Sequence, residues 1–305
     1  MRSKYLFLLL YDWPDIMKSL QPWRAYGTDG CILFSDILTP LPGMGIEFDI
    51  LEKEGPKMKA WSTMADVDKI HTINPAVSTP FVAEALKCLR KEVGNKAAVL
   101  GFVGLPYTLA TYMVEGGSSS EYKKTKSLAY QNPAVLHAML EKLADNIGDY
   151  AIFQIESGAQ VIQLFDSWAG HLSPVDYDVF AAPYQRKVID KIKKAYPAVP
   201  TILYINRSGA LLERMASSGV DIISLDWTVS VEEALQRIGP KVGIQGNLDP
   251  MLLFAPDQVI QERTESILRS CSGRRHIMNL GHGIDAETSE VKAKFFVDTV
   301  KNYRL

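Results

Sequence analysis

The sequence predicts an α/β protein folded as a (β/α)8 TIM barrel whose first strand is atypical or incomplete. From Gly30 onward, seven short apolar runs alternate with segments of helical periodicity, which is the spacing of βα units around a parallel sheet. Most of these runs end in polar residues, as is typical of a barrel rim, where the loops share one active site. The alternative, a doubly wound sheet, is disfavoured because no run is followed by G-x-G-x-x-G.

The composition is that of an ordinary globular protein. The 305 residues are 47% hydrophobic, and 33 basic against 35 acidic side chains give a net charge of −2. This balance leaves no excess of positive charge that would favour binding to nucleic acid or to an anionic membrane surface. Cys31, Cys88 and Cys271 lie far apart without a C-x-x-C or Cys/His cluster, so they predict free thiols in a reducing compartment rather than a zinc site or disulfides.

The first clear strand is predicted over residues 30–38. Its apolar run is interrupted at Asp36, and a short run of this kind is typical of a strand buried on both faces. An aspartate at such a strand end either caps the following segment or points into a site. The proline- and glycine-rich segment 39–45 then predicts a long loop, and long loops on this side of a sheet often carry function.

A closed barrel requires an eighth strand, because an open edge leaves backbone hydrogen-bonding groups unpaired. The candidate is 5–11, and we expect Leu6, Leu8 and Leu10 to be buried beside the Asp36 strand. The alternative for this region is a targeting signal, since basic residues precede the apolar run. The run is too short to span a membrane, and no small-residue cleavage site follows it.

The remaining elements follow in order along the chain. Apolar residues at helical spacing predict a helix over 81–93, which Gly94 ends. Further strands are predicted over 97–104, 159–166, 201–206, 220–227, 242–250 and 276–284. Further helices are predicted over 15–20, 65–70, 133–156, 183–196, 210–217, 231–238, 258–270 and 290–303. The small residues that end segment 112–120 predict either a mobile loop or a backbone that approaches a ligand closely.

Six motifs occur in an order that resembles one family. They are FSDILTPLPGMGIEFDI, GFVG-x-P-x-TL-x-TYMVEGGSS, GAQVIQLFDSWAGHLSP, GVDIISLDWTV, QGNLDP and NLGHGI. Together they resemble uroporphyrinogen decarboxylase, most closely the plastid and cyanobacterial type. The resemblance runs from about Ser19 to the C-terminus, and several separate motifs make it far more specific than one pattern match.

The resemblance implies a single (β/α)8-barrel decarboxylase domain over residues 1–305. It implies the conversion of uroporphyrinogen III to coproporphyrinogen III by removal of four acetate carboxyl groups, in haem and chlorophyll biosynthesis. The family uses neither a metal nor an organic cofactor and is commonly a homodimer. The implied partner is the tetrapyrrole substrate, with no nucleic acid and no membrane, and the implied location is the plastid (chloroplast) or else the cytoplasm.

The family's site residues match five positions here. Loss of CO2 from a carbon attached to a pyrrole needs an electron sink, which ring protonation supplies, and a nearby anion in a dry site stabilises the resulting cation. Asp36 matches the family aspartate with that catalytic and binding role. Tyr112, Ser167 and His282 match positions that contact substrate; taken alone, His282 would be a core histidine. Phe34, with Phe165, is expected to line the pocket.

The chain departs from the family pattern at three places. The family begins with a segment similar to RQAGRY, whose arginines bind substrate carboxylates, whereas this chain begins Arg2-Ser3-Lys4-Tyr5 and is expected to be N-terminally truncated relative to the family. Arg207 follows Asn206 where a small residue, often glycine, is usual. The loop around Thr288 is contracted.

Two other functions stay open at this stage. One is an inactive tetrapyrrole-binding fragment, because the arginine segment is absent. The other is a methyltransferase of the same superfamily, linked to zinc or cobalamin. No His-x-Cys pair occurs in the sequence, and this disfavours the zinc site that such an enzyme needs.

Overall fold

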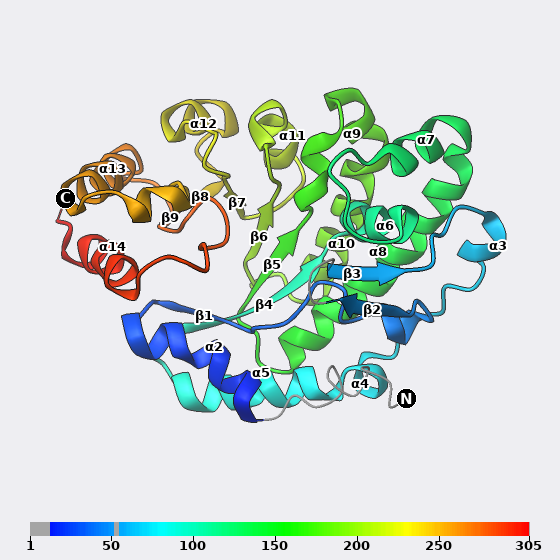
Figure 1. Cartoon of the computed structure of the whole chain (residues 1–305), viewed down its shortest axis with the longest axis horizontal. Helices are drawn as coiled ribbons and strands as arrows, with labels where there is room; N and C mark the ends of the chain where they lie inside the picture. The colour runs from blue at the N-terminus through cyan, green and yellow to red at the C-terminus, as the bar shows by residue number, and fades with distance from the viewer. Residues whose placement is uncertain (1–12, 52–54, 305) are drawn as a thin grey trace.

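The computed structural model describes residues 13–51 and 55–304, and its centre is a curled parallel sheet of seven strands (Figure 1). The strand order is β1-β4-β5-β6-β7-β8-β9, so each strand pairs with the next one along the chain that belongs to the sheet. The predicted α/β class and the seven parallel strands are confirmed. The strands are β1 (Gly30–Ile32), β4 (Ala98–Gly104), β5 (Val161–Phe165), β6 (Thr201–Tyr204), β7 (Ile222–Ser224), β8 (Gly243–Gln245) and β9 (His276–Ile277).

Helices surround the sheet, as expected for βα units (Figure 1). Both α5 and α8 pack on β4, and α10 packs on α8. The α-helices are α2 (Trp13–Tyr26), α3 (Met64–Val67), α4 (Pro75–Ser78), α5 (Pro80–Val93), α6 (Pro106–Glu115), α7 (Lys123–Gln131), α8 (Pro133–Glu156), α9 (Pro174–Phe180), α10 (Ala182–Ala195), α11 (Leu212–Ala216), α12 (Val231–Ile238), α13 (Asp257–Ser270) and α14 (Glu290–Asn302). Short 3-10 helices are η1 (Leu41–Met44), η2 (Ser167–His171), η3 (Ser208–Ala210) and η4 (Pro250–Phe254).

Four α-helices (α4, α6, α7 and α9) and one hairpin were not predicted. Helix α6 begins at Pro106, where a proline is tolerated because the first helical N–H needs no partner. It is buried on nearly every side, so its sequence lacks the polar face that reveals an amphipathic helix. Helices α7 and α9 are short, and the antiparallel hairpin of β2 (Phe48–Leu51) and β3 (Gly55–Met58) follows the predicted loop 39–45, which itself contains η1.

The first predicted strand is shorter than expected. Regular pairing of β1 with β4 covers Gly30–Ile32, and one further bond joins the Leu33 N–H to the Leu100 carbonyl at 3.0 Å. The Phe34 N–H then donates to Ser19 Oγ of α2 at 2.7 Å instead of to a neighbouring strand. The chain therefore leaves the sheet just before Asp36.

The two end strands of the sheet are β1 and β9. Within residues 13–51 and 55–304, no strand joins them, and the eighth strand predicted over 5–11 lies outside the described residues. Ile32 of β1 is 41% exposed and Ile277 of β9 is 40% exposed, so apolar side chains at both ends of the sheet remain accessible. Helix α2 packs on β1, and α14 packs on α2.

A buried amide joins the longest helix to the sheet. Gln154 of α8 is fully buried; its Oε1 accepts from the Phe102 N–H at 2.9 Å, and its Nε2 donates to the Phe102 carbonyl at 2.8 Å. A Cβ on Gly101 would lie 2.4 Å from Gln154 Oε1, so glycine is required for this approach. The clamp fixes α8 against β4.

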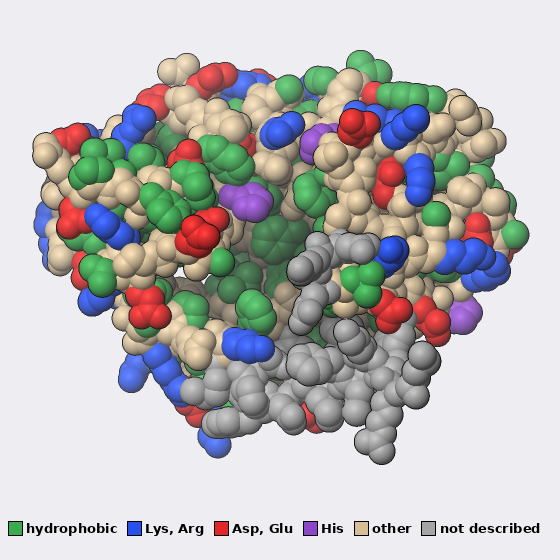
Figure 2. Space-filling view, viewed as in Figure 1, with side chains coloured by type: hydrophobic (Ala, Val, Ile, Leu, Met, Phe, Trp, Pro, Cys, Tyr) green, Lys and Arg blue, Asp and Glu red, His purple; other side chains and the backbone are tan. Residues whose placement is uncertain are grey.

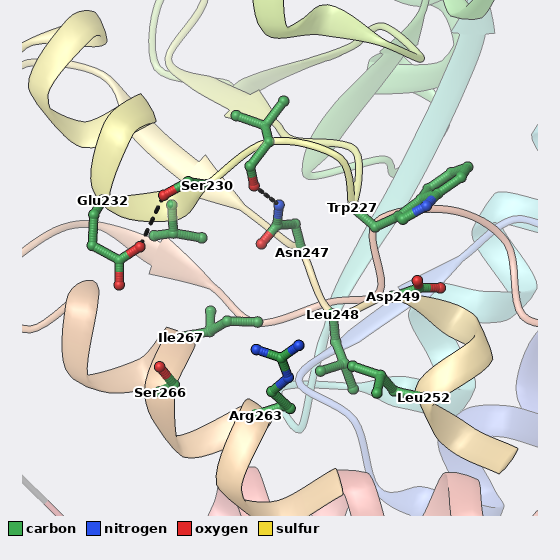
Figure 3. A pocket seen from close by; sticks show the side chains of 12 residues that line it. Trp227, Ser230, Glu232, Asn247, Leu248, Asp249, Leu252, Arg263, Ser266 and Ile267 are labelled. Carbon is green, nitrogen blue, oxygen red and sulfur yellow. Dashed lines mark hydrogen bonds between the residues drawn. The ribbon is translucent and has the colours of Figure 1, made fainter. Parts of the chain in front are cut away.

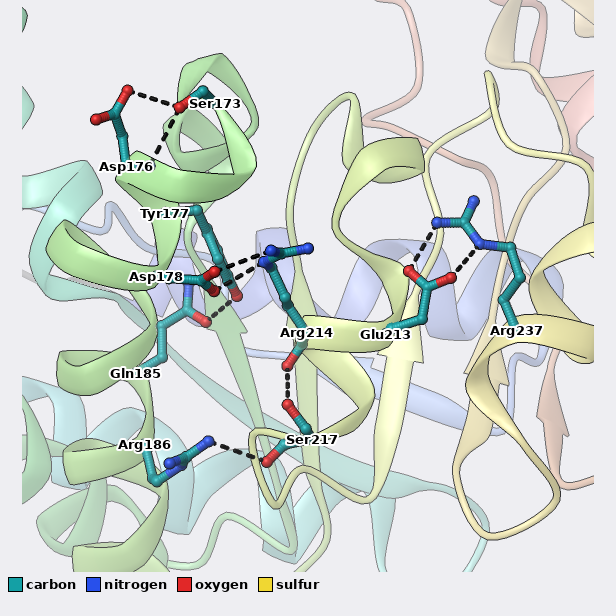
Figure 4. Close-up of polar contacts among 10 residues, drawn as sticks. All are labelled: Ser173, Asp176, Tyr177, Asp178, Gln185, Arg186, Glu213, Arg214, Ser217 and Arg237. Carbon is teal, nitrogen blue, oxygen red and sulfur yellow. Dashed lines mark hydrogen bonds and ion pairs between the residues drawn. The ribbon is translucent and has the colours of Figure 1, made fainter.

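Ion pairs connect the outer helices on the β6 and β7 side (Figure 4). Arg214 of α11 holds Asp178 of α9 with two bonds of 2.7 and 2.9 Å, and Arg237 of α12 holds Glu213 of α11 with two bonds of 2.6 and 2.8 Å. These side chains are partly exposed, so each pair contributes roughly 0–1 kcal/mol. Their main effect is to fix the spacing of α9, α11 and α12.

Asp166, at the end of β5, is a fully buried carboxylate. Its Oδ1 accepts from the Thr108 N–H at 2.9 Å and from Thr108 Oγ1 at 2.8 Å, and its Oδ2 accepts from Gln185 Nε2 at 2.7 Å. Gln185 in turn accepts from the Tyr177 hydroxyl at 2.5 Å (Figure 4). Asp166 therefore joins α6, α9 and α10 at one point and is not open to a ligand.

This carboxyl group makes the stability of the fold depend on pH. Burial raises the pKa of Asp166 to about 6, although its hydrogen bonds lower it, whereas an unfolded aspartate titrates near ~3.9. The folded state therefore binds the proton more tightly, and we expect the free energy of unfolding to fall as pH rises from about 4 to about 6. Asp166→Asn, which does not titrate, is expected to flatten that slope in urea unfolding at several pH values.

Asp49→Asn on the exposed face of β2 is the control for this measurement and should leave the slope as it is. A slope that is the same in the parent chain and in Asp166→Asn would contradict the assignment.

Candidate functional site

Asp36 lies just beyond β1 and is half-buried. Its Oδ1 accepts from the Leu38 N–H at 2.8 Å, and its backbone carbonyl accepts from the Thr39 N–H at 3.1 Å, so it supports the turn that follows. Within the described chain Leu38 supplies the one hydrogen bond to this carboxylate, which leaves Oδ2 without a hydrogen bond from the described residues. Burial raises the pKa of Asp36, and the Leu38 N–H lowers it.

Tyr112 reaches the same region from α6. Burial raises the pKa of its hydroxyl, and the Asp36 carboxylate raises it too, which places the two groups within electrostatic reach of each other. The Tyr112 ring centroid lies 6.1 Å from that of Trp168 in η2. The loops after β1, β4 and β5 thus meet at one place.

Ser167 begins η2 directly after Asp166 and is half-buried. Its backbone carbonyl accepts from the Asn206 N–H at 3.3 Å, which connects the loops after β5 and β6. The Asn206 side-chain oxygen is buried and has no partner among the described residues. An unsatisfied buried acceptor is rare, so this oxygen marks a point where a ligand or a water would donate a hydrogen bond.

His282 belongs to an arc of rings that crosses the carboxyl ends of the strands. The centroid separations are 5.8 Å for Phe102–Phe165, 5.9 Å for Phe165–Tyr204, 6.4 Å for Tyr204–His282 and 5.6 Å for Trp227–His282. The His282 side chain is exposed, so it is not the core histidine that the sequence left open.

A glycine sets the position of the His282 loop. The Tyr204 hydroxyl donates to the Gly281 carbonyl at 3.3 Å. A Cβ on Gly281 would lie 2.4 Å from the backbone nitrogen of Trp227, so the loop can pack this closely only with glycine at this position.

Phe34 presents an apolar surface beside Asp36. It is 57% exposed, and Lys18 Nζ of α2 lies 5.9 Å from its ring centroid. Phe165 is half-buried within the aromatic arc. Figure 2 shows a hollow on the viewed face of the molecule, with hydrophobic side chains in it and Lys, Arg, Asp, Glu and His side chains around it.

Asp226, at the end of β7, holds the turn after β6. This fully buried carboxylate accepts from the Ser208 N–H at 2.8 Å and from Ser208 Oγ at 3.0 Å, and it also binds the N–H and hydroxyl of Thr228. Arg207, directly before Ser208, has φ 59° and ψ 43°. A side chain in this left-handed region costs roughly 1–2 kcal/mol per residue, and this cost explains why glycine is favoured there.

The glycine-rich segment 116–117 approaches protein backbone rather than a ligand. A Cβ on Gly117 would lie 2.7 Å from the Pro56 carbonyl oxygen, and the Gly116 carbonyl accepts from the Met58 N–H at 3.0 Å. Glu115 also accepts from the Thr125 N–H and hydroxyl, each at 2.8 Å. The small residues were predicted to form either a mobile loop or a close approach to a ligand. In the structure, Gly116 and Gly117 instead connect the end of α6 to β3.

A separate pocket of about 370 Å³ lies between α12, α13 and the turn after β8 (Figure 3). Arg263 of α13 points into it, while the Trp227 indole points away from Arg263. None of the five predicted site residues lines this pocket, so it is distinct from the region around Asp36.

Sequence reasoning missed several aromatic groups of the site. The rings of Tyr122, His171 and Trp168 pack together in tilted arrangements, with centroids 4.3 Å apart for Tyr122–His171 and 5.5 Å apart for Tyr122–Trp168. Trp168 and His171 stand in the same short motif as Ser167, and this proximity was an available signal. Tyr122 lies in the glycine- and serine-rich region and had no local signal of its own.

Neither a metal cluster nor a membrane-spanning helix occurs among the described residues. In residues 13–51 and 55–304, no three His, Cys, Asp or Glu side chains are grouped so that they could hold a metal ion. Over the same ranges, none of the helices is both long enough and apolar enough to cross a membrane.

The family model and the similar curated proteins agree on one family. Residues 1–303 match the family model for uroporphyrinogen decarboxylase (URO-D). The chain is 54% identical over 279 residues to uroporphyrinogen decarboxylase of Synechococcus sp. (strain CC9605), covering 91% of this chain and 79% of that protein. It is 54% identical over 285 residues to the uroporphyrinogen decarboxylase of a strain of Prochlorococcus marinus, covering 93% of this chain and 81% of that protein.

Among solved structures, a methyltransferase from Methanosarcina mazei superposes with a TM-score of 0.81 at 20% identity, covering 94% of this chain and 84% of that one. This likeness supports the predicted TIM-barrel-like fold and nothing about the reaction. The family model and the cyanobacterial relatives carry the assignment: the chain belongs to the uroporphyrinogen decarboxylase family.

Proposed function

We propose that this protein decarboxylates uroporphyrinogen III, turning its four acetate side chains into methyl groups to give coproporphyrinogen III. The observation that supports this most directly is family membership along nearly the whole chain, together with a half-buried carboxylate that retains an open oxygen at the matching position. Asp36 would be the catalytic residue, and Phe34, Tyr112, Ser167 and His282 would contact the substrate.

Each decarboxylation consumes one proton and releases one CO2. Protonation of the pyrrole ring creates a cation, and the electron pair of the breaking C–C bond flows into that ring. A second proton then reaches the exocyclic carbon while the ring proton is lost, so the net exchange is one carboxylate and one proton for one CO2 and one methyl group. Asp36 would stabilise the cation and accept pyrrole N–H hydrogen bonds through the oxygen that Leu38 leaves open.

The surroundings of Asp36 suit this task. A partly desolvated carboxylate interacts more strongly with a cationic ring than a fully hydrated one does. The exposed apolar side chains Ile32 and Phe34 offer a surface for a flat macrocycle. Tyr112, within electrostatic reach of Asp36, would donate a hydrogen bond from its hydroxyl to a carboxylate arm.

Three finer assignments remain proposals. We propose a homodimer, to be tested by light scattering, and location in the plastid, to be tested by imaging the full-length protein, since the relatives described above are cyanobacterial. The single-domain organisation of residues 1–305 stays a prediction that a single cooperative calorimetric transition would support. An inactive tetrapyrrole-binding protein is the second candidate function, and it predicts binding without turnover.

Asp36→Asn is the direct test of the reaction. Because the variant removes the anion and keeps the shape, we expect the rate of CO2 loss to fall by roughly 10²–10³-fold. The measurement is anaerobic incubation with uroporphyrinogen III, followed by separation of the products by their number of carboxyl groups.

Asp49→Asn on the exposed β2 strand is the matched control and should leave the rate unchanged. Equal rates in Asp36→Asn and the parent chain would remove Asp36 from the mechanism. No product from a folded, porphyrin-binding parent chain would support the inactive alternative.

Tyr112→Phe tests substrate contact. Loss of one hydroxyl donor to a charged arm should lower kcat/KM by about tenfold, since hydrogen bonds to charged groups contribute ~1.5–3 kcal/mol. The control is Tyr130→Phe on α7, whose hydroxyl donates to Asp176 at 3.0 Å. A Tyr112→Phe variant with the kcat/KM of the parent chain would exclude the hydroxyl from substrate binding.

A further inference from the structure

Two non-glycine residues near the site adopt the left-handed backbone conformation. In the described parts of the chain, Tyr122 with φ 54° and Arg207 with φ 59° are the non-glycine residues with positive φ. Such conformations persist only where the surroundings enforce them, and they concentrate at functional sites. The two residues come from different loops, after β4 and after β6.

Both residues adjoin the segment that carries His171. The Tyr122 ring lies 4.3 Å from the His171 ring, centroid to centroid. A Cβ on the neighbouring Gly170 would lie 1.8 Å from the Asn206 carbonyl oxygen and 3.3 Å from that of Arg207. The segment that carries His171 therefore packs directly on the turn that carries Arg207.

The backbone around Arg207 is fixed on both sides. The Asn206 N–H donates to the Ser167 carbonyl at 3.3 Å, and the Ser208 N–H and hydroxyl donate to buried Asp226 at 2.8 and 3.0 Å. These contacts hold the unfavourable conformation of Arg207, whose side chain is exposed.

Two positively charged side chains lie near this turn, and neither has a partner among the described residues. Neither Arg207 nor Lys126 of α7 makes a side-chain hydrogen bond or ion pair with another residue in that part of the chain. Burial lowers the pKa of His171, and Arg207 and Lys126 lower it further, so both cations lie within its electrostatic reach. The acid that faces Tyr122, Glu115, already accepts from Thr125.

We propose that Arg207, Lys126 and His171 form a carboxylate-binding site that takes one anionic arm of the substrate. This inference rests on the proposed function. The guanidinium offers a planar pair of donors that matches a carboxylate, Lys126 adds a second positive charge, and His171 adds a hydrogen bond. The site would stand apart from Asp36, which faces the ring system rather than its arms.

The test is fluorescence titration with uroporphyrin, the oxidised octacarboxylate that is not turned over. Arg207→Gln should weaken binding by about tenfold, the loss of one charge-assisted contact. Arg207→Gly should weaken binding as much while raising Tm by about 1–2 °C, because glycine relieves the left-handed backbone. A purely structural role would move affinity and stability in the same direction.

Arg269→Gln on the exposed face of α13 is the matched control and should bind as the parent chain does. Parent-like affinity in both Arg207 variants, with decarboxylation intact, would overturn the carboxylate-binding site and leave the proposed function standing. A parent chain that neither binds uroporphyrin nor decarboxylates uroporphyrinogen would overturn both.

Discussion

The carboxyl edge of the sheet depends on two buried aspartates. Asp166 at the end of β5 receives three hydrogen bonds from α6 and α10, and Asp226 at the end of β7 holds the turn after β6. A buried carboxylate is costly unless hydrogen bonds satisfy it, so each position is stable only with its donors in place. Helix α6 with Tyr112, η2 with Trp168 and the turn with Arg207 take their positions from these two residues.

The sequence was sufficient for the seven parallel strands of the main sheet and their order, because each is a distinct apolar run with polar residues at or near its end. It was not sufficient to separate the functions of those polar residues. Asp36, Asp166 and Asp226 look alike in sequence, yet the donors that occupy Asp166 and Asp226 come largely from other segments of the chain. Only the folded arrangement of the described residues leaves one of the three carboxylates with an open oxygen.

The sequence also predicted some residues of the candidate site and missed others. The structure brings Asp36 and Tyr112 within electrostatic reach of each other and places exposed His282 against the rings of Tyr204 and Trp227. Tyr122 and His171 were missed because their ring contact joins two distant loops. The departure at Arg207 was visible in the sequence, but its left-handed backbone and its neighbours were not. Helix α6 was missed because complete burial erases the periodicity that identifies a helix.

Gly170 and Gly281 carry a consequence for how such a rim can evolve. A methyl group at either position would overlap the backbone of a neighbouring loop, at Asn206 or at Trp227. Neither glycine has a side chain to offer a substrate, yet a larger residue at either position would have to displace a neighbouring loop. A survey of which positions along this edge of the sheet accept mutation would therefore not separate positions that hold the loops together from positions that take part in the reaction. A position that accepts no mutation here can simply mark two loops that approach closely. The reactive positions are recognised instead by side chains whose hydrogen-bonding groups are left unsatisfied.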